Sequence, residues 1–377
     1  MRGKRYWLAA SLVLVLVLTA CSSGSQSGSS DKPADSGTTT AAPATTPAAP
    51  ATSAPATAQS KSRLDIVLER GKLICGVHGG LPGFGYLGSD GKYSGFDVDY
   101  CRALAAALFN DPEKVEYKNL NASQRFTAVQ TGEVDVLIRN TTWTVSRDTS
   151  VGMEFAPTTF YDGQGMMVRK DSGIKSLKDF EGRSVCVETG TTTELNLADV
   201  MRKLGVKYDS VVYTDAASAV SAYTDGRCDG YTTDKSGLVS YKSKMPVPDD
   251  HVILEETMSK EPLGPLTINN DSKWFDVVKW LVHVTIEAEE YGITSKNVDQ
   301  LKAESKDPTI RRMLGVEGDL GKGMGLSNDW VYRVIKHVGN YGEIFDRNLG
   351  PGTPYNLPRG MNKLYKDGGI LYAPPYR

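Results

Sequence analysis

From Leu64 onward, strand-like segments alternate with helix-like segments, and this alternation constrains the fold more than any other feature of the chain. Residues 72–77 have the apolar content of a buried strand, and residues 97–109 have the spacing of an amphipathic helix with acids in its first turn. A short helix at 125–130 and a strand at 134–138 follow. Strands that alternate with helices favour parallel sheets, so we predict an α/β fold.

A second set of such segments begins after Val168, and it contains a short motif of the first set. Gly132-x-x-Asp135 and Gly226-x-x-Asp229 each close a predicted helix, open a predicted strand and lead to a pair of threonines. Chance can produce such an echo, and two lobes of like architecture would also produce it. The predicted elements of this set are strands at 184–187, 211–213 and 228–232 and helices at 177–180, 193–204 and 216–223.

Two extended stretches, 161–168 and 261–268, separate the two sets. If both cross between lobes, the chain leaves the first lobe, builds the second and returns, and the two crossings form a hinge. Predicted helices at 274–291 and 328–338 then belong to the first lobe. We predict lobe 1 from residues 63–164 and 266–377, and lobe 2 from residues 165–265.

The N-terminal segment has the features of a secretory leader. Basic residues precede an apolar run from Leu8 to Leu18, which is too short for a permanent transmembrane helix. The run ends in Leu-Thr-Ala-Cys21, which resembles a bacterial lipobox, and an ordinary signal peptide with a chance cysteine is the alternative. We therefore predict a signal peptide at 1–20, a lipid on Cys21, and a disordered Ser-, Thr-, Ala- and Pro-rich linker to residue 62.

Four cysteines remain after Cys21, and an even number in an oxidising compartment suggests two disulfides. Of the three possible pairings we favour Cys75–Cys101 and Cys186–Cys228, since each pair then falls inside one predicted lobe. Free buried thiols are the alternative.

No cysteine or histidine spacing is typical of zinc, so no metal is expected. A net charge of −2 gives no basic field for nucleic acid, and no later segment is apolar enough to span a membrane.

Segments spread over the mature chain resemble the polar-amino-acid solute-binding proteins of ABC transporters, the extracytoplasmic solute-binding family 3. The segments are LPGFG (81–85), GFDVDYCRALAAALF (95–109), RFTAVQTGEVDVLIRNTTWTVSRD (125–148), YDGQGMMV (161–168), SVCVETGTTTELNLAD (184–199), GRCDGYTTDKSGL (226–238), SKEPLGP (259–265) and GLSNDWVYRVIKHVGNYGEIFDRNLGP (325–351). The resemblance implies the two-lobed fold of type II periplasmic binding proteins, with a free L-amino acid held between the lobes. It also implies a monomer outside the cytoplasm that delivers ligand to an ABC permease without a cofactor, and the lipobox-like segment predicts that a lipid anchors this protein to the cell membrane.

A free amino acid carries one carboxylate and one ammonium, and burial of both needs a fixed cation and a fixed anion. The resemblance places Arg147 on the carboxylate, Asp234 on the ammonium, and Asn140 and Thr142 beside them. An exposed role for Arg147 and a helix cap for Asp234 are the alternatives. Thr191 and Glu194 fit a capping box at a helix start that suits a carboxylate, which the family places on Thr192.

The cleft wall is less well defined by the sequence. Family members often place an aromatic residue over the ligand, and Phe84 or Tyr86 could serve here. Arg125 and Arg139 could reach the cleft and favour acidic side chains, or they could be structural. The nearest family likeness implies a cleft that accepts many amino acids.

Two other functions are compatible with the same fold. An enzyme of the cyclohexadienyl dehydratase type would need a titrating group in the cleft, and only Glu188 and His78 are candidates. A lone histidine or glutamate in such a place is more often a side-chain contact or a packed residue, so we predict Glu188 to be a ligand contact and the protein not to be an enzyme. A ligand-sensing receptor module is the other alternative, and it would need a separate signalling partner.

Overall fold

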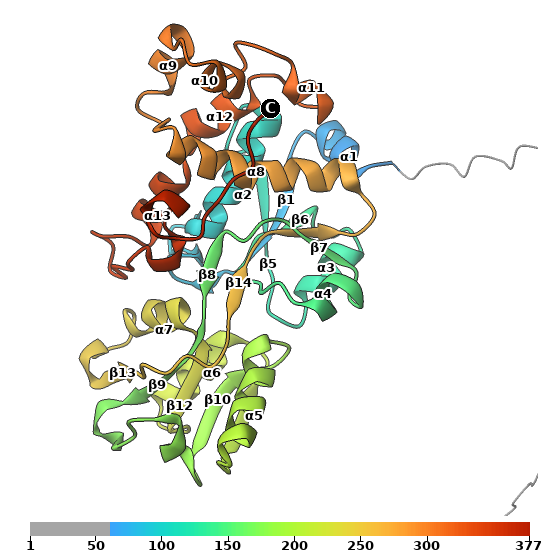
Figure 1. Cartoon of the computed structure of the whole chain (residues 1–377). Coiled ribbons are helices and arrows are strands. Elements are labelled where there is room, and N and C mark those ends of the chain that lie inside the picture. The colour runs from blue at the N-terminus through green and yellow to red at the C-terminus, as the bar shows by residue number, and fades with distance from the viewer. Residues whose placement is uncertain (1–60) are drawn as a thin grey trace, which may run out of the picture. The chain divides into compact units, whose positions relative to one another are not determined.

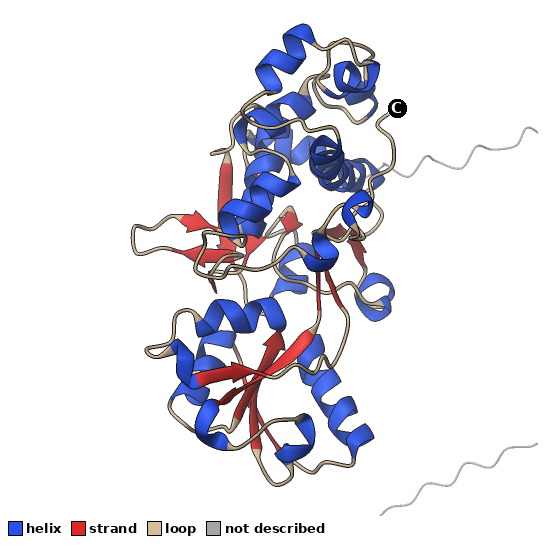
Figure 2. Cartoon of the chain, turned by 60° about the vertical axis from the view of Figure 1, so that its left-hand side comes forward, coloured by secondary structure: helices blue, strands red, loops and turns tan. Residues whose placement is uncertain are grey.

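The computed structural model describes residues 61–377, and two mixed five-stranded sheets dominate them (Figures 1 and 2). The strand order is β5-β1-β6-β15-β7 in the first sheet and β11-β10-β12-β9-β13 in the second. In each sheet the first three strands of this order are parallel, and the other two join antiparallel. The predicted α/β class with two lobes is confirmed. The predicted leader, Cys21 and linker residues up to Ser60 lie outside the described residues.

The strands have the following bounds. The first sheet contains β1 (Leu73–Val77), β5 (Val115–Asn119), β6 (Val136–Leu137), β7 (Met153–Phe155) and β15 (Leu266–Ile268). The second contains β9 (Gln164–Arg169), β10 (Ser184–Glu188), β11 (Asp209–Tyr213), β12 (Gly230–Asp234) and β13 (His251–Ile253). A small antiparallel sheet that the sequence did not predict contains β2 (Gly80–Leu81), β3 (Gly85–Leu87) and β4 (Tyr93–Ser94).

Helices cover both sheets. Around the first lie α1 (Arg63–Arg70), α2 (Phe96–Phe109), α3 (Arg125–Gln130), α4 (Val145–Thr149), α8 (Ser272–Glu290), α9 (Val298–Glu304), α10 (Pro308–Met313), α11 (Leu320–Gly323), α12 (Trp330–His337) and α13 (Tyr341–Asn348). Around the second lie α5 (Thr192–Leu204), α6 (Ala216–Thr224) and α7 (Lys235–Lys242). Short 3-10 turns lie at η1 (Lys170–Ser172), η2 (Leu177–Phe180), η3 (Pro248–Asp250), η4 (Gly360–Asn362) and η5 (Tyr365–Asp367).

The repeated Gly-x-x-Asp motif has the same structural task in both lobes. The Asp135 carboxylate accepts from the Ile74 amide at 2.7 Å, and the Asp135 amide donates to the Ile74 carbonyl at 2.9 Å. Asp229 repeats both bonds with Ser184, at 2.8 and 3.0 Å. Each aspartate thereby fixes the strand that follows it against the first parallel strand of its own sheet. The sequence echo therefore reflects two lobes of like architecture.

Two antiparallel strands, β8 (Phe160–Asp162) and β14 (Glu261–Leu263), run side by side between the two lobes (Figure 1). Each predicted crossing stretch is in fact two strands, because β9 and β15 follow in the two main sheets. At Gly264, which separates β14 from β15, an added Cβ would lie 3.2 Å from the carbonyl oxygens of Ala156 and Pro157. Glycine is needed there because two backbones approach closely.

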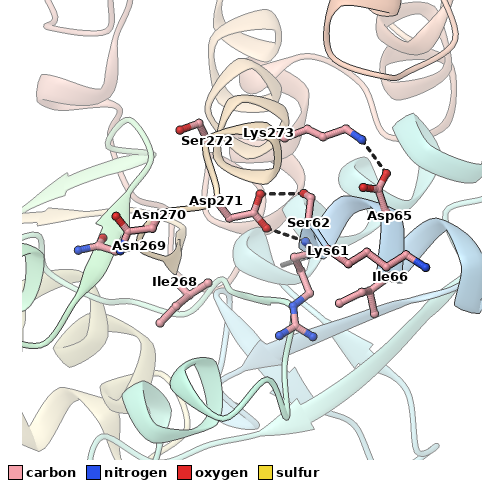
Figure 3. Close-up of a pocket in the computed structure, with 11 residues that line it drawn as sticks. Lys61, Ser62, Asp65, Ile66, Ile268, Asn269, Asn270, Asp271, Ser272 and Lys273 are labelled. Atoms are coloured by element: carbon pink, nitrogen blue, oxygen red, sulfur yellow. Dashed lines mark hydrogen bonds and ion pairs between the residues drawn. The ribbon is translucent and has the colours of Figure 1, made fainter. Parts of the chain in front are cut away.

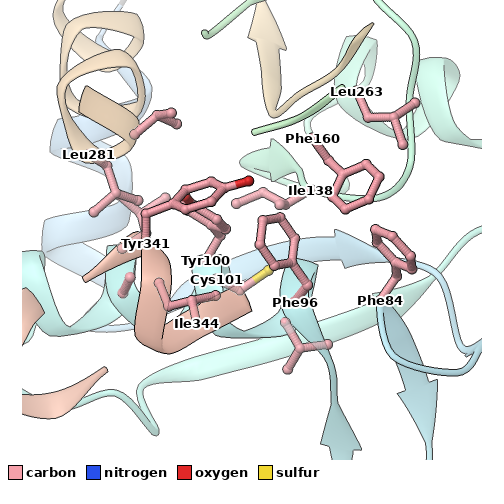
Figure 4. Packing of buried hydrophobic residues seen from close by; sticks show 14 of the residues in the cluster. Phe84, Phe96, Tyr100, Cys101, Ile138, Phe160, Leu263, Leu281, Tyr341 and Ile344 are labelled. Atoms are coloured by element: carbon pink, nitrogen blue, oxygen red, sulfur yellow. The ribbon is translucent and has the colours of Figure 1, made fainter. Parts of the chain in front are cut away.

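The first lobe has an aromatic core at the start of α2. The Phe84 ring lies 6.1 Å from Phe96 and 5.1 Å from Phe160, both edge to face, and Tyr341 packs on Phe96 from α13 (Figure 4). Edge-to-face pairs of this kind add to the free energy of apolar burial. The C-terminal helices thereby pack against the lobe in which the chain began.

The four cysteines of the described chain form the two predicted disulfides, Cys75–Cys101 and Cys186–Cys228. The first joins β1 to α2, and the second joins β10 to the segment before β12. Each bond thus ties the central parallel strand of one sheet to a neighbouring segment of the same lobe.

Among the helices of residues 61–377, none has the length and apolar content needed to cross a membrane.

Candidate ligand-binding site

A small cavity of about 20 Å³ lies between the lobes, at the carboxyl ends of the parallel strands. Ligands of open α/β sheets bind at this end of the strands. Direct hydrogen bonds join the lobes here: the Thr142 and Thr192 hydroxyls lie 3.3 Å apart, and the Ala122 amide donates to Glu188 Oε1 at 3.2 Å. The lining residues are Arg125, Arg139, Asn140, Thr142, Glu188, Thr191, Thr192, Thr193, Thr233 and Asp234.

The N-terminus of α5 points its threonines at this cavity. Thr191 caps the helix, because its hydroxyl accepts from the Glu194 amide at 3.1 Å. The reciprocal bond of the predicted capping box differs: Glu194 Oε2 accepts from the Gly190 amide at 3.0 Å instead of from Thr191. Thr192 is the first residue of α5 and lines the cavity with its neighbours. The amides of this first turn provide a positive potential for an anion.

Asp234 ends β12 and lies immediately before α7. Its side chain makes no capping hydrogen bond, although its position is that of a helix cap. Burial raises its pKa well above the ordinary value, and the carboxylates of Asp162 and Glu261 raise it further. The Asn140 side chain of the other lobe and the charge of Arg125 lower this pKa and so act in the opposite direction. The carboxyl group is therefore placed to respond to a nearby cation.

Arg147 lies in α4 on the first lobe, with 7% of its surface exposed. Its Nη1 donates to the Thr142 carbonyl at 2.7 Å, and its guanidinium lies 5.3 Å from the centre of the Phe126 ring. Burial lowers its pKa to about 10, while Glu261 and Asp234 act in the opposite direction. The group therefore keeps its charge at neutral pH. It lies behind the residues that line the cavity, next to Thr142.

Glu261 opens β14 and connects both lobes, a role that the sequence did not predict. Its carboxylate accepts from Thr142 of the first lobe, from Thr192 of the second at 2.9 Å, from Asn196 at 2.8 Å, and from Ser259. It is buried at 1% exposure. The only sequence signal is an acid inside the extended stretch EPLGPLTI.

Arg125 and Arg139 also line the cavity, and both are buried. Arg125 donates to Thr141 Oγ1 at 3.3 Å and, across the cleft, to the Gly190 carbonyl at 3.4 Å. Burial lowers its pKa, and the charges of Arg147 and Arg139 lower it further. Arg139 follows β6, and its Nε and Nη1 have no hydrogen-bond partner within residues 61–377.

The structure brings Asn140, Thr142, Glu188, Thr191, Thr192 and Asp234 together in the cavity lining, which contains neither Arg147 nor Phe84. Phe84 is 1% exposed in the aromatic core and is absent from the cavity lining. Tyr86 of β3 is exposed. Glu188, at the end of β10, lines both this cavity and an adjoining hollow of about 280 Å³ that also contains His78. Burial lowers the pKa of His78, helped by Arg139 and Arg125, so this imidazole is a neutral wall group.

A larger hollow of about 850 Å³ lies elsewhere, where α1 meets the start of α8 (Figure 3). Its polar groups mostly bond one another: Asp271 accepts from the Ser62 hydroxyl at 2.7 Å and the Arg63 amide at 2.6 Å, and Lys273 pairs with Asp65. These groups already have partners, and they do not combine charges from two lobes. No group of three or more histidines, cysteines or acids within residues 61–377 could hold a metal.

Two α/β lobes, a pair of connecting strands and a charged cavity between them define a bilobal binding protein. A sequence profile of the bacterial extracellular solute-binding proteins, family 3, matches residues 73–312. The chain belongs to this family. The relatives named below are binding proteins, which confirms the prediction that the chain is not an enzyme.

Two relatives are similar over most of their length. The chain is 51% identical over 323 residues to the general L-amino acid-binding periplasmic protein AapJ of Rhizobium johnstonii, covering 85% of this chain and 94% of that one. It is 49% identical over 320 residues to the glutamate/glutamine/aspartate/asparagine-binding protein BztA of Rhodobacter capsulatus, covering 85% and 95%.

Solved structures agree with the architecture. A periplasmic binding protein from Brucella ovis with glutathione bound is 51% identical, with a TM-score of 0.82, and the match covers 84% of this chain and all of that one. An ancestral arginine-binding protein bound to arginine is 30% identical, with a TM-score of 0.52, over 61% of this chain and 98% of that one. The two-lobed type II periplasmic binding fold that the resemblance implied is therefore confirmed.

Proposed function

We propose that this chain is the extracytoplasmic amino-acid-binding component of an ABC importer. It captures a free L-amino acid between its lobes and presents it to the permease. The relatives support this proposal, because two that are about half identical are named as amino-acid-binding proteins. In this proposal residues 63–164 and 266–377 form lobe 1, and residues 165–265 form lobe 2.

One observation carries the proposal: the two lobes bring buried charges of opposite sign to one small region. Asp234 of the second lobe lines the cavity, Arg147 of the first lobe lies next to Thr142 of the lining, and Asp234 raises the pKa of Arg147. An α-carboxylate would pair with Arg147, Thr142 and the start of α5 at Thr191 and Thr192. An ammonium would pair with Asp234 and with Asn140, whose side-chain oxygen has no partner within residues 61–377. Ligand would thus complete the contact between the lobes.

The test is a thermal-shift screen of the purified protein against the twenty amino acids and glutathione, followed by calorimetry. A ligand that binds the folded state raises the melting temperature in proportion to the logarithm of its concentration. We expect stabilisation by several L-amino acids and none by the matching D-amino acids. Absence of any stabilisation by an amino acid would contradict the proposal.

We also propose that the mature protein begins at a lipidated Cys21 and that the linker holds the lobes off the membrane surface. The lipobox-like sequence supports this, and residues 1–60 lie outside the structural description. A wild-type protein made in its host should partition into detergent, and Cys21→Ser should be released in soluble form. Equal partition of both proteins would reject the lipid anchor.

A further inference from the structure

Arg147 is enough to pair with the single α-carboxylate of an amino acid, yet the site contains two further buried cations, Arg139 and Arg125. Arg139 is 2% exposed and Arg125 is 3% exposed, and both line the interlobe cavity. Arg139 leaves Nε and Nη1 without acceptors, and Arg125 leaves Nε without one, within the described chain. Buried donors without partners are costly, so a site that keeps them usually supplies a partner.

The acids near the cavity make no direct ion pair with these cations, although Glu188 and Asp234 raise the pKa of Arg125 through their charges. Within residues 61–377 neither arginine forms an ion pair with a carboxylate at 4.0 Å or less. Glu261 already accepts four hydrogen bonds from neutral donors. Glu188 accepts from the Ala122 amide, and Asp97 accepts from the Asn140 amide at 2.9 Å. The free donors of Arg139 and Arg125 therefore point to an acceptor that the ligand brings.

We propose that Arg139, assisted by Arg125, binds a second carboxylate on the ligand side chain, so that the preferred substrates are α-amino acids with acidic side chains. This inference rests on the proposed amino-acid site, where Arg147 is already assigned to the α-carboxylate. A guanidinium can hold a carboxylate through two parallel hydrogen bonds, which a side-chain amide matches less well. A neutral side chain would leave the buried donors of Arg139 unpaired.

The reach of Arg125 adds a reason for this preference. Its guanidinium donates to the carbonyl of Gly190 in the second lobe and to Thr141 in the first. A carboxylate beside it would therefore contact both lobes, in addition to the α-groups. Glu188 lines both the cavity and the hollow beside His78, and a carboxylate there disfavours the ligand's second carboxylate at that wall relative to the arginines.

The test compares L-glutamate with L-glutamine, which have nearly the same shape and differ in side-chain charge. Calorimetry on the wild type should show tighter binding of L-glutamate by about tenfold or more. Arg139→Gln should weaken the binding of L-glutamate by about tenfold or more and change the affinity for L-glutamine by less than about threefold. Arg125→Gln should shift the ratio in the same direction. The control Arg202→Gln, in which the exposed guanidinium of α5 is removed, should leave both affinities unchanged.

The outcomes separate this inference from the proposed function. Equal wild-type affinities, or an Arg139→Gln variant that weakens both ligands equally, would overturn the second-carboxylate site while the amino-acid site stands. Failure of every amino acid to bind the wild type would overturn both. Melting curves of the ligand-free variants show whether each variant is folded, and Arg125→Gln provides an independent result where Arg139→Gln does not fold.

Discussion

At the scale of the residue, Arg147 and Asp234 are held by different means. Arg147 is fixed by the Thr142 carbonyl and the Phe126 ring, so its fork is in position before any ligand arrives. Asp234 is held at the junction of β12 and α7, where it lines the cavity together with Asn140 of the other lobe. A preorganised cation beside Thr142 and a buried acid of raised pKa in the cavity wall therefore lie at the two sides of the cleft.

The first prediction concerns Arg147. Arg147→Ala should weaken amino-acid binding by about tenfold or more, because the buried ligand carboxylate loses its charged partner. Calorimetry with the best ligand of the screen measures this. Arg202→Ala, an exposed arginine of α5, is the control and should bind as the wild type does. Unchanged affinity in Arg147→Ala would assign the carboxylate to another group.

The second prediction concerns the pH dependence of binding. Burial and the neighbouring acids raise the pKa of Asp234, so the free protein holds a proton there at pH values where an exposed aspartate is ionised. A bound ammonium favours the carboxylate, which lowers that pKa, and binding then releases a proton. Affinity should therefore rise with pH until the raised pKa is passed, and it should level off above it.

Calorimetry in two buffers of different ionisation enthalpy counts the released proton. Asp234→Asn should bind more weakly and lose most of the pH dependence that the wild type shows. Asp199→Asn is the control: it removes an exposed carboxylate of α5 that pairs with Arg202, and it should keep the pH dependence of the wild type. A wild type that releases no proton at any pH from about 5 to 8 would contradict this role for Asp234.

At the scale of the element, the two disulfides fix each central strand to its lobe. Cys186 lies in β10, and Cys228 lies before β12, 42 residues along the chain. Cys186→Ser with Cys228→Ser should lower the free energy of unfolding by about 2–4 kcal/mol, because the unfolded chain gains freedom. Urea unfolding followed by tryptophan fluorescence measures this.

Thiol titration of the denatured wild type provides the control for the same bond. The mature protein should show no reactive thiol, since Cys75, Cys101, Cys186 and Cys228 are paired and Cys21 carries lipid. Two or more reactive thiols would reject the two-disulfide arrangement. The Cys75–Cys101 pair should remain intact in the double-serine variant.

Elements with strong periodicity could be predicted from the sequence, and elements fixed by tertiary contacts could not. The α8 helix and the strands β1 and β10 have apolar patterns that local spacing defines, whereas β5, with the sequence VEYKN, has none and was not predicted. The strands β2, β3 and β4 have two or three residues each, and the turn between β2 and β3 accepts hydrogen bonds from the first amides of α2. Phe84 was predicted as a wall residue, but its ring packs in the core, since loop register depends on partners that are distant in sequence.

The same limit applies to the site. Arg147, Asp234 and Thr192 could be located because the family resemblance places them at strand ends and a helix start. Glu261 was missed, because nothing near it in sequence shows that Thr142 and Thr192 converge on its carboxylate. Its role follows from two lobes that meet, which only the three-dimensional arrangement shows.

At the scale of the whole molecule, the cavity is too small for its proposed ligand. About 20 Å³ holds roughly one water molecule, and an amino acid is several times larger. The direct bonds from Thr142 to Thr192 and from Ala122 to Glu188 must therefore break for the ligand to enter. The β8–β14 pair is the connection about which the lobes can separate.

The last prediction is that the lobes separate without ligand and that an amino acid favours their approach. Spin labels on exposed sites of opposite lobes, Lys114→Cys just before β5 and Asp209→Cys at the start of β11, report the interlobe distance by pulsed electron resonance. The ligand-free protein should give a broad distribution that reaches long distances, and saturating ligand should shift it to shorter ones, because ligand contacts both lobes only when they are close. Labels at Asp209→Cys and Lys244→Cys, both beside the second sheet, should give one unchanged distance. A distribution from the interlobe pair that ligand does not alter, at concentrations where calorimetry shows full binding, would mean that entry occurs through local side-chain motion instead of hinge opening.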